Sequence, residues 1–479
     1  MTQELDSRET YDQSSKPSTA NDKDKSARLG TDPIGKLLLH YSLPAILGMT
    51  VSSLYSVIDR IFIGNGVGPY AISGLALTMP MMNLMMAFGA MIGAGASTMI
   101  SIRMGQKRTE DATNILGNTL ILNFIIGFII MVLGLIYLDD ILTAFGASDK
   151  TLPYARDFMQ IVLISSLFSS NFYGLNNVMR ATGYPKKAMY SSMLSVGVNL
   201  ILAPIFIFVL HWGIRGAALA TAIAQLCGFI WVFSHFMNKS HFIHFQQGYF
   251  KLKKRIIRDI LSIGMSPFLM NVGASVVAMI INMSLHKYGG GGERSDMAIG
   301  AYGIVNAVAI LFVMVTLGLT MGMQPIVGYN YGARQNHRAL RAYKLTAVAA
   351  VLVTTTGFLL AMFIPRPLAS LFTKDLDLIN QSVIALRTVL LIFPLVGFQI
   401  VTTSFFQSVG KAYLAIILSL SRQLLFLIPF VLIFPHFWGL HGVWMASPAG
   451  DLLSSLITIA LIATQWKKIL PASSPIPDK

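Results

Sequence analysis

The chain has 479 residues, of which 54% are hydrophobic and only 12% are charged. Because soluble domains carry about 25% charged residues, this composition excludes a string of soluble domains and indicates a polytopic membrane protein. The formal net charge of +15 would suggest a nucleic-acid partner in a soluble protein, but the basic residues lie in alternate short loops, so membrane topology accounts for them. We therefore expect a lipid bilayer around the chain and no nucleic-acid partner.

Residues 1–33 are polar and rich in Ser, Thr, Asp and Lys. They lack the apolar region of a signal peptide, and their composition is typical of a disordered segment. We expect a disordered cytoplasmic tail, and we expect the first apolar span to serve as its own insertion signal.

A helix needs about 20 predominantly apolar residues to cross the hydrocarbon core of a bilayer. Twelve segments meet this requirement, and they lie at 36–63, 69–101, 114–138, 153–179, 187–211, 215–237, 255–286, 296–328, 339–364, 380–408, 411–435 and 440–465. The expected fold class is therefore an all-α polytopic membrane protein with 12 transmembrane helices.

The loops between these spans alternate in charge. The even-numbered loops carry Lys and Arg, whereas the first loop, at 64–70, has no charged residue. The positive-inside rule then predicts a multi-pass protein with both termini in the cytoplasm. The sixth loop is the longest, and it is both basic and aromatic. Its apolar residues would rest on the inner membrane surface, or the segment is a plain linker.

The two halves of the chain repeat each other at an offset of about 225 positions. Corresponding pairs are Gly95 and Gly322, Gly105 and Gly332, Gly213 and Gly439, and Asp59 and Asn282. We expect an N-lobe at 34–238, an inter-lobe linker at 239–254, a C-lobe at 255–466 and a cytoplasmic tail at 467–479. Since each lobe has an even number of spans, the pseudo-twofold axis should follow the membrane normal, with a central cleft between two six-helix lobes that alternate access.

Catalytic motifs are missing from the sequence. Gly410-Lys411 is followed by Ala412, which breaks the nucleotide-binding pattern, and no zinc-peptidase or nucleophile-elbow motif occurs. The single cysteine, Cys227, lies in an apolar span, so there is no Cys/His metal cluster. We predict that the protein is not an enzyme, needs no cofactor, and uses an ion gradient as its energy source.

Asp59, in the outer part of the first span, is the main candidate for ion coupling. A carboxylate within the membrane costs on the order of 3 kcal/mol on insertion scales, so such residues tend to be functional. Burial favours the protonated form of a carboxylate, which would allow a proton to load and leave. The alternative is that Asp59 lies at the outer interface and pairs with Arg60.

A second charged pair lies in the other half, where Asp451 is in the last span and Arg422 in the span before it. We interpret the two as a structural ion pair, and a second coupling site is the alternative. In the first half, several polar side chains either hydrogen-bond Asp59 inside the lobe or join neighbouring helices. They are Asn171, Asn176, Asn177, Asn199 and Thr221.

Methionines crowd the second span. Methionine is flexible and polarisable and suits surfaces that accept many shapes, so a substrate surface is one interpretation and lipid-facing filler is the other. The candidates for the substrate cleft are Met82, Met85 and Met86 in this span, with Asn271 and Asn282 in the seventh span.

Two sequence motifs identify a family. The first span ends in Val-Ile-Asp-Arg-Ile-Phe-Ile-Gly at 57–64, and an Asn-to-Phe segment at 199–208 is followed by Gly-Ile-Arg-Gly-Ala-Ala-Leu-Ala-Thr at 213–221. With the twelve spans and the duplication, the chain from 34 to 465 resembles the multidrug and toxic compound extrusion (MATE) family, in its bacterial branch. The resemblance implies a monomeric antiporter of the bacterial inner (plasma) membrane that exports small amphipathic or cationic drugs.

The resemblance also implies roles for individual residues. Asp59 looks like the family's coupling carboxylate in the N-lobe, and Tyr55, Asn176, Asn199 and Thr221 look like members of its polar network. The Asn176 match could instead fall on Asn177.

One departure from the family pattern concerns the coupling ion. Many relatives carry a second acidic residue four positions after the span-five asparagine, where this chain has Ala203. A sodium site of hard oxygen ligands would lose a carboxylate there, which favours protons, although sodium at Asp59 stays open.

The alternative function is a flippase for a lipid-linked precursor in the same wider superfamily. Such a protein would need a cationic cleft for a sugar-phosphate head group. The chain has little intramembrane Lys or Arg beyond Arg60, Arg180 and Arg422, which counts against this alternative.

Overall fold

The computed structural model describes residues 27–246, 248–291 and 293–469, and the regular elements in these ranges are all helices. The helices of the first half are α2 (Ile34–Gly66), α3 (Pro69–Gly105), α4 (Thr109–Ile136), α5 (Leu138–Ala144), α6 (Leu152–Ala181), α7 (Pro185–Pro204), the π-helix η1 (Ile205–Val209) and α8 (Gly213–Met237). Those of the second half are α9 (Lys254–Tyr288), α10 (Glu293–Gly332), α11 (Asn336–Phe363), α12 (Pro365–Ser370), α13 (Leu376–Val389), α14 (Phe393–Ser408), α15 (Ala412–Leu420), the π-helix η2 (Ser421–Leu427) and α16 (Ile428–Ile469).

Within the described residues, 10 helices are long and apolar enough to cross a membrane, or 11 if the bent pair Leu376–Val389 and Phe393–Ser408 forms one span. The last of these candidates, Ala412–Gln465, has 54 residues. At 1.5 Å per residue it would be about 80 Å long, more than twice the thickness of the hydrocarbon core. The chain breaks within it at Gly439, where φ is 55° and ψ is −135°, so this segment supplies two spans and the expected twelve are accounted for.

The break at Gly439 has a counterpart in the first half. Gly213, the first residue of α8, also has a φ of 55°, a left-handed conformation that glycine adopts without strain. After each break the chain returns against its preceding helix, since a Cβ on Gly442 would lie 2.5 Å from the Phe434 carbonyl and one on Gly216 would lie 3.0 Å from Phe206. The two halves therefore repeat the same tight helical hairpin.

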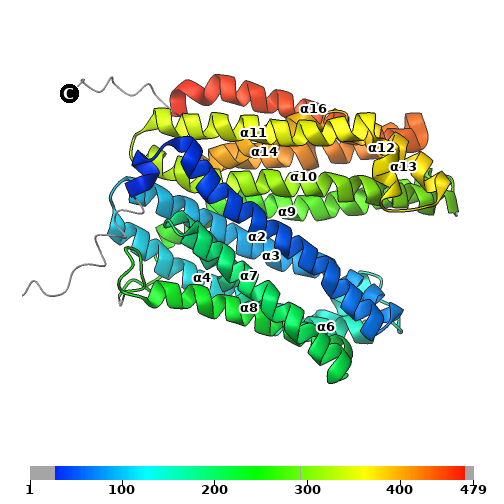
Figure 1. Cartoon of the computed structure of the whole chain (residues 1–479), viewed down its shortest axis with the longest axis horizontal. Helices are drawn as coiled ribbons and strands as arrows, with labels where there is room; N and C mark the ends of the chain where they lie inside the picture. Colours follow the sequence, from blue (N-terminus) through cyan, green and yellow to red (C-terminus); the bar gives the residue numbers. More distant parts are fainter. Residues whose placement is uncertain (1–26, 247, 292, 470–479) are drawn as a thin grey trace, which may run out of the picture.

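The helices form two bundles (Figure 1). Helices α3 to α8 make up the N-lobe, and the greater part of the chain from α9 onward makes up the C-lobe. The first helix of each half crosses between them. Leu37 and Tyr41 of α2 are buried in an apolar cluster of the C-lobe with Phe405, whereas Ile260 and Ile263 of α9 are buried in an N-lobe cluster. The start of each crossing helix therefore packs against the opposite lobe from the one to which the expected boundaries at 34 and 255 assign it.

The lobes meet closely at the end of the molecule that carries the described chain ends and the α8–α9 connection, which we call the terminal end. A Cβ on Gly105 would lie 2.0 Å from the carbonyl oxygen of Tyr329, and one on Gly332 would lie 2.1 Å from the carbonyl oxygen of Ile102. These two contacts are related by the internal repeat and join α3 to α10. In Figure 1 the two bundles converge at this end and diverge towards the opposite end.

The expected disordered tail is too long by several residues. Residues 27–31 are helical, and Leu29 is fully buried in the C-lobe cluster. The carbonyl of Leu29 accepts a hydrogen bond of 2.9 Å from the Asn330 amide, and Arg338 donates one of 2.6 Å to the Asp32 carbonyl. These contacts order the chain before α2. Residues 1–26 of the predicted tail and the last ten residues of the chain lie outside the described residues, and α16 continues to Ile469.

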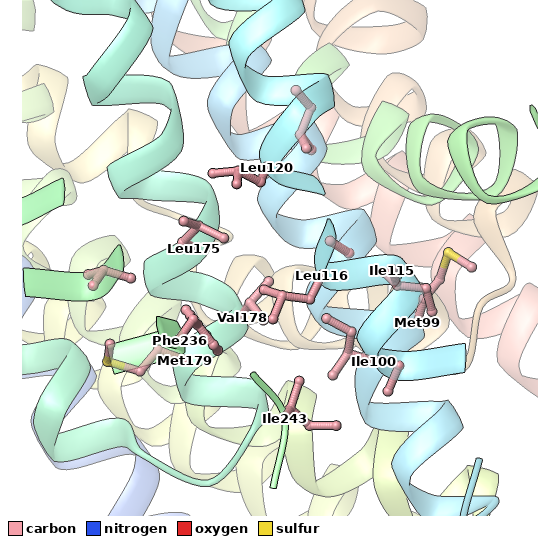
Figure 2. Packing of buried hydrophobic residues seen from close by; sticks show 14 of the residues in the cluster. Met99, Ile100, Ile115, Leu116, Leu120, Leu175, Val178, Met179, Phe236 and Ile243 are labelled. Carbon is pink, nitrogen blue, oxygen red and sulfur yellow. The ribbon is translucent and has the colours of Figure 1, made fainter. Parts of the chain in front are cut away.

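The α8–α9 connection packs against protein. Ile243 is 2% exposed within the N-lobe cluster of Figure 2, and the Phe245 ring lies 5.4 Å from Phe233. The buried Asn118 of α4 accepts a hydrogen bond of 2.8 Å from the Lys253 amide and donates one of 3.2 Å to the Lys251 carbonyl. These contacts bind the segment to the N-lobe, while Phe250 stays 37% exposed, so both the membrane-surface and the plain-linker interpretation stay open.

Candidate functional site

Asp59 lies in α2 about 10 Å from the end of the helix at Gly66, given seven residues at 1.5 Å each. Its Oδ1 is shielded from solvent and accepts no hydrogen bond from the described chain. Arg60 is exposed and its guanidinium points to the Met79 sulfur, at 3.5 Å. Among the described residues no Lys or Arg forms an ion pair with Asp59, so the alternative pairing with Arg60 is not formed. The carboxyl group is therefore available to a small cation.

A polar network lies one helical turn from Asp59 and joins three helices. The Asn199 amide of α7 donates hydrogen bonds of 2.8 Å to the Tyr55 hydroxyl of α2 and 3.0 Å to the Thr221 hydroxyl of α8. The two hydroxyls are 3.4 Å apart. Since residues four apart are neighbours on a helix surface, Tyr55 and Asp59 share one face of α2. The structure thus brings together three of the side chains that the resemblance singled out.

The expected partners Asn176 and Asn177 lie elsewhere. Asn176 donates to the Ala188 carbonyl at 2.8 Å and to the Ser191 hydroxyl at 2.7 Å, and its Oδ1 accepts from Arg180. Ser191 lies eight residues before Asn199 on α7, so it is about 12 Å nearer the terminal end than the Asn199 network. Asn177 lines a pocket between the lobes. Asn176 therefore joins α6 to α7, which is the alternative interpretation of this group, and its contacts do not include Asp59.

Asn171 also makes its contacts locally. Its side-chain amide donates to the Leu167 carbonyl of its own helix at 3.0 Å, and its Oδ1 is buried without a described donor. The position of Asn171 along α6 does not by itself show whether its side chain reaches Asp59 or bonds locally. The sequence therefore left both interpretations open.

Methionines of α3 line a pocket of the N-lobe, and the substrate surface expected there stays a prediction. Met82, Met85 and Met86 share this pocket with Tyr173 of α6 and Gln225 of α8. Met86 is 53% exposed, so the pocket offers both a buried wall and an accessible one. We call it the methionine pocket.

The predicted cleft residues of the second half are not part of this pocket. Asn271 of α9 is exposed and donates to the Pro267 carbonyl of its own helix at 2.8 Å. Asn282, the counterpart of Asp59, is exposed on the same helix. Neither lines the methionine pocket.

In the C-lobe, Arg422 of η2 and Asp451 of α16 form the expected ion pair, with Nε 2.8 Å from Oδ1. Asp451 is 8% exposed. One turn further on, Ser454 donates to the Gln399 amide oxygen at 3.1 Å, so α14, η2 and α16 are held together by polar contacts.

The described part of the chain contains no group of three or more His, Cys, Asp or Glu placed to hold a metal ion.

One feature that sequence reasoning missed is the surroundings of Arg180, which was noted only as one of a few basic residues within the membrane spans. The side chain lines an inter-lobe pocket with Thr98 of α3 and Gln324 of α10. The sequence did contain a hint that Arg180 lacks an acidic partner on its own or the next helices, because no acidic residue occurs between Asp157 and Asp259.

The comparisons with known proteins agree with this architecture. The MatE family model matches residues 44–205 and again 267–433, once in each half. The chain belongs to the MatE family. It is 29% identical over 410 residues to the multidrug export protein MepA of Staphylococcus haemolyticus, covering 86% of this chain and 89% of that protein. It is 26% identical over 430 residues to MepA of Staphylococcus aureus, covering 90% and 94%.

Solved structures of other MATE proteins share the fold. A multidrug resistance MATE family transporter of the MOP superfamily, in an outward-facing conformation, superposes with a TM-score of 0.86 at 24% identity, covering 94% of this chain and 99% of that chain. MATE in a bent conformation superposes with a TM-score of 0.87 at 25% identity, covering 93% and 98%. The all-helical, two-lobed fold expected from the sequence is confirmed, and these relatives are transporters by name, not enzymes.

Proposed function

We propose that this MatE protein is a secondary active exporter of small amphipathic and often cationic compounds, driven by proton entry through Asp59. The observation that carries the proposal is the carboxyl group of Asp59. Its Oδ1 accepts no hydrogen bond from the described chain, and it lies one turn from the network formed by Tyr55, Asn199 and Thr221. The names of the curated relatives, which are multidrug export proteins, agree with the substrate class.

Protons are favoured over sodium for two reasons. An unpaired carboxylate in a poorly hydrated site is costly, and protonation removes that cost. Ala203, where many relatives have an acidic residue, is fully buried in an apolar cluster, so a sodium ion would find only neutral oxygens besides Asp59. Sodium coupling through those neutral oxygens is the alternative that the experiment below distinguishes.

The way the lobes meet supports alternating access. If both termini are cytoplasmic, in a multi-pass protein of the bacterial inner membrane, the α3–α10 contacts close the cytoplasmic side and this conformation faces outward. A proton can shift the equilibrium only through its different affinity for the two states. Protonation of Asp59 from outside would favour the state that releases the drug, and deprotonation inside would reset the cycle. The methionine pocket supplies apolar and aromatic surface for the substrate, in a transporter that works as a monomer.

Transport into inside-out vesicles under an imposed pH gradient tests this proposal. We expect a cationic dye to accumulate in vesicles with the native protein, without sodium, and to stop accumulating with Asp59→Asn. Asp140→Asn, which alters an exposed carboxylate of α5, is the matched control and should transport normally. Accumulation that survives in Asp59→Asn, or that requires sodium, would overturn proton coupling at Asp59. No dye transport by the native protein would favour the flippase alternative.

A further inference from the structure

A cavity larger than the methionine pocket, at about 250 Å³, lies at the terminal end between the starts of α2 and α7. These two helices run side by side (Figure 1). Arg28 and Lys36 line one side of the cavity, and Lys186 and Lys187 line the other. The cavity has room for a phosphate group, since about 15 Å³ of such space already holds a water molecule. We call it the basic pocket.

The basic pocket carries an excess of positive charge. Four of the described residues that line it are Lys or Arg, and Asp32 is the one acid among them. This acid is already engaged, because Arg28 donates to its carboxylate at 3.0 Å. No described carboxylate forms an ion pair with Lys36 or Lys186, and both lysines are exposed. A bound anion would offset this charge at an accessible site.

The first turn of α7 adds backbone donors to one wall of the basic pocket. The helix begins at Pro185, and no side chain caps its first turn. The first N–H groups of a helix have no partner within the helix, and together with the helix dipole they favour an anion. The Lys187 ammonium lies 5.0 Å from the centre of the Tyr184 ring, and this ring is buried. Ammonium groups and backbone donors therefore border the same space.

Both walls of the basic pocket continue along their helices into apolar surface. Leu43 is exposed and lies two turns beyond Lys36 on the same face of α2. Tyr190 and Leu194 are also exposed and follow Lys186 at intervals of four residues on α7. Acyl chains can cover such surface, whereas a soluble anion gains nothing from it. Since basic pockets between transmembrane helices bind anionic lipid head groups, these features favour a phospholipid.

The two walls of the basic pocket belong to different lobes. Leu37 and Tyr41, which line it beside Lys36, are buried in the C-lobe cluster. Tyr184, on the opposite wall, is buried in the N-lobe cluster. When the lobes meet at the terminal end, cations of both lobes therefore surround one space, and their repulsion opposes this conformation.

We propose that the basic pocket binds the phosphate of an anionic phospholipid, and that the bound lipid stabilises the conformation in which the lobes meet at the terminal end. A ligand shifts an equilibrium only through its different affinity for the two states. The lipid meets this condition, because the two walls face each other only when the lobes are together. This site goes beyond the proposed function, since it depends neither on the coupling ion nor on the exported compound.

Native mass spectrometry of the full-length protein in detergent tests the binding. The probes are phosphatidylglycerol and, with the same acyl chains, phosphatidylcholine. We expect Lys36→Gln combined with Lys186→Gln to raise the Kd of phosphatidylglycerol about 25-fold, at about five-fold for each lysine. The Kd of phosphatidylcholine should change less than about two-fold. Each single substitution should have about a five-fold effect, which keeps the test valid if the double variant does not fold.

A matched control removes the same charge elsewhere. Lys254→Gln combined with Lys344→Gln alters two exposed lysines, of α9 and α11, that do not line the basic pocket, and the Kd of phosphatidylglycerol should not change. An equal loss of binding in this control would overturn the site, because attraction would then be spread over the surface. Displacement of the lipid by excess glycerol 3-phosphate would assign the pocket to a soluble phosphate and overturn the lipid.

Spin-label distances between the lobes at the terminal end test the effect on conformation. In liposomes of phosphatidylglycerol, the native protein should populate the closed distance more than in phosphatidylcholine. The variant without Lys36 and Lys186 should show no such difference between the two lipids. A native protein whose distances are the same in both lipids would overturn the stabilising role, as would a variant that keeps the full lipid dependence.

Discussion

The ion pair between Arg422 and Asp451 provides a quantitative test of the C-lobe. The two side chains are 25% and 11% exposed and lie 2.8 Å apart. Removing one partner of a buried pair costs about 3–5 kcal/mol, because the other charge is left uncompensated. Asp451→Asn and Arg422→Gln should therefore each destabilise the lobe by this amount. At about 2–4 °C per kcal/mol for a unit of this size, the melting temperature should fall by roughly 6–20 °C.

Scanning fluorimetry of the purified protein measures this effect, and a double substitution interprets it. Arg422→Met with Asp451→Leu removes both charges and keeps apolar volume, so it should recover most of the lost stability. Asp139→Asn is the matched control, since the side chains of its ion pair with Arg156 are 54% and 40% exposed. Exposed ion pairs contribute little to stability, so this variant should melt close to the native protein.

The same variants distinguish a structural pair from a second coupling site. If Arg422 and Asp451 only hold the lobe together, the double apolar variant should still transport dye under a pH gradient. The structural interpretation would be refuted if Asp451→Asn melted like the native protein but lost proton-driven accumulation. That outcome would assign Asp451 a role in coupling.

Three other substitutions test the contacts described above. Gly105→Ala would place a Cβ 2.0 Å from the Tyr329 carbonyl oxygen, so spin-label distances between the lobes at the terminal end should lengthen. In the control Gly197→Ala, the added Cβ has no atom within 4 Å, and the distances should not change. Unaltered distances in Gly105→Ala would contradict the close contact of the lobes at this end. Asn118→Ala removes two hydrogen bonds to the α8–α9 connection, at about 2–3 kcal/mol in total, and the Lys253 amide should lose protection in hydrogen exchange. Asn199→Ala should lower the melting temperature by a few degrees, since interhelical hydrogen bonds in membranes contribute about 1 kcal/mol each; no change in melting would show that the network with Tyr55 and Thr221 is not structural.

Periodicity and repetition predicted the fold because they depend on features that the bilayer imposes. Twelve apolar spans follow from the thickness of the hydrocarbon core, and paired glycines such as Gly105 and Gly332 mark positions where backbones approach closely. The boundary of the first tail was wrong because burial of Leu29 depends on a groove formed by residues about 300 positions later. Composition cannot reveal a partner at that distance.

The candidate site was predictable to a similar degree. Asp59 could be identified because a carboxylate in an apolar span is unusual. The nearby network of Tyr55, Asn199 and Thr221 followed from the family resemblance. Asn176 could not be placed, because residues on adjacent turns of α6 reach different helices and the side-chain direction depends on packing. Arg180 was missed for a different reason. A basic residue near a span end is explained by the positive-inside rule until the structure shows which lobe faces it.

The crossing of α2 and α9 bears on how the lobes can move. Each of these helices is buried in one lobe at its start and belongs to the other lobe at its end, so rocking of the lobes must deform both helices between the two attachments. In α2 a proline, Pro44, lies between Tyr41 in the C-lobe cluster and the Asp59 site. In α9 the corresponding Pro267 lies between Ile263 in the N-lobe cluster and Val277 in a C-lobe cluster. Proline removes a helical hydrogen bond and lets a helix bend at a defined point. A bend at Pro44 would reorient the outer part of α2 against α7 and α8, and would thereby couple the position of the lobes to the surroundings of the Asp59 carboxyl group.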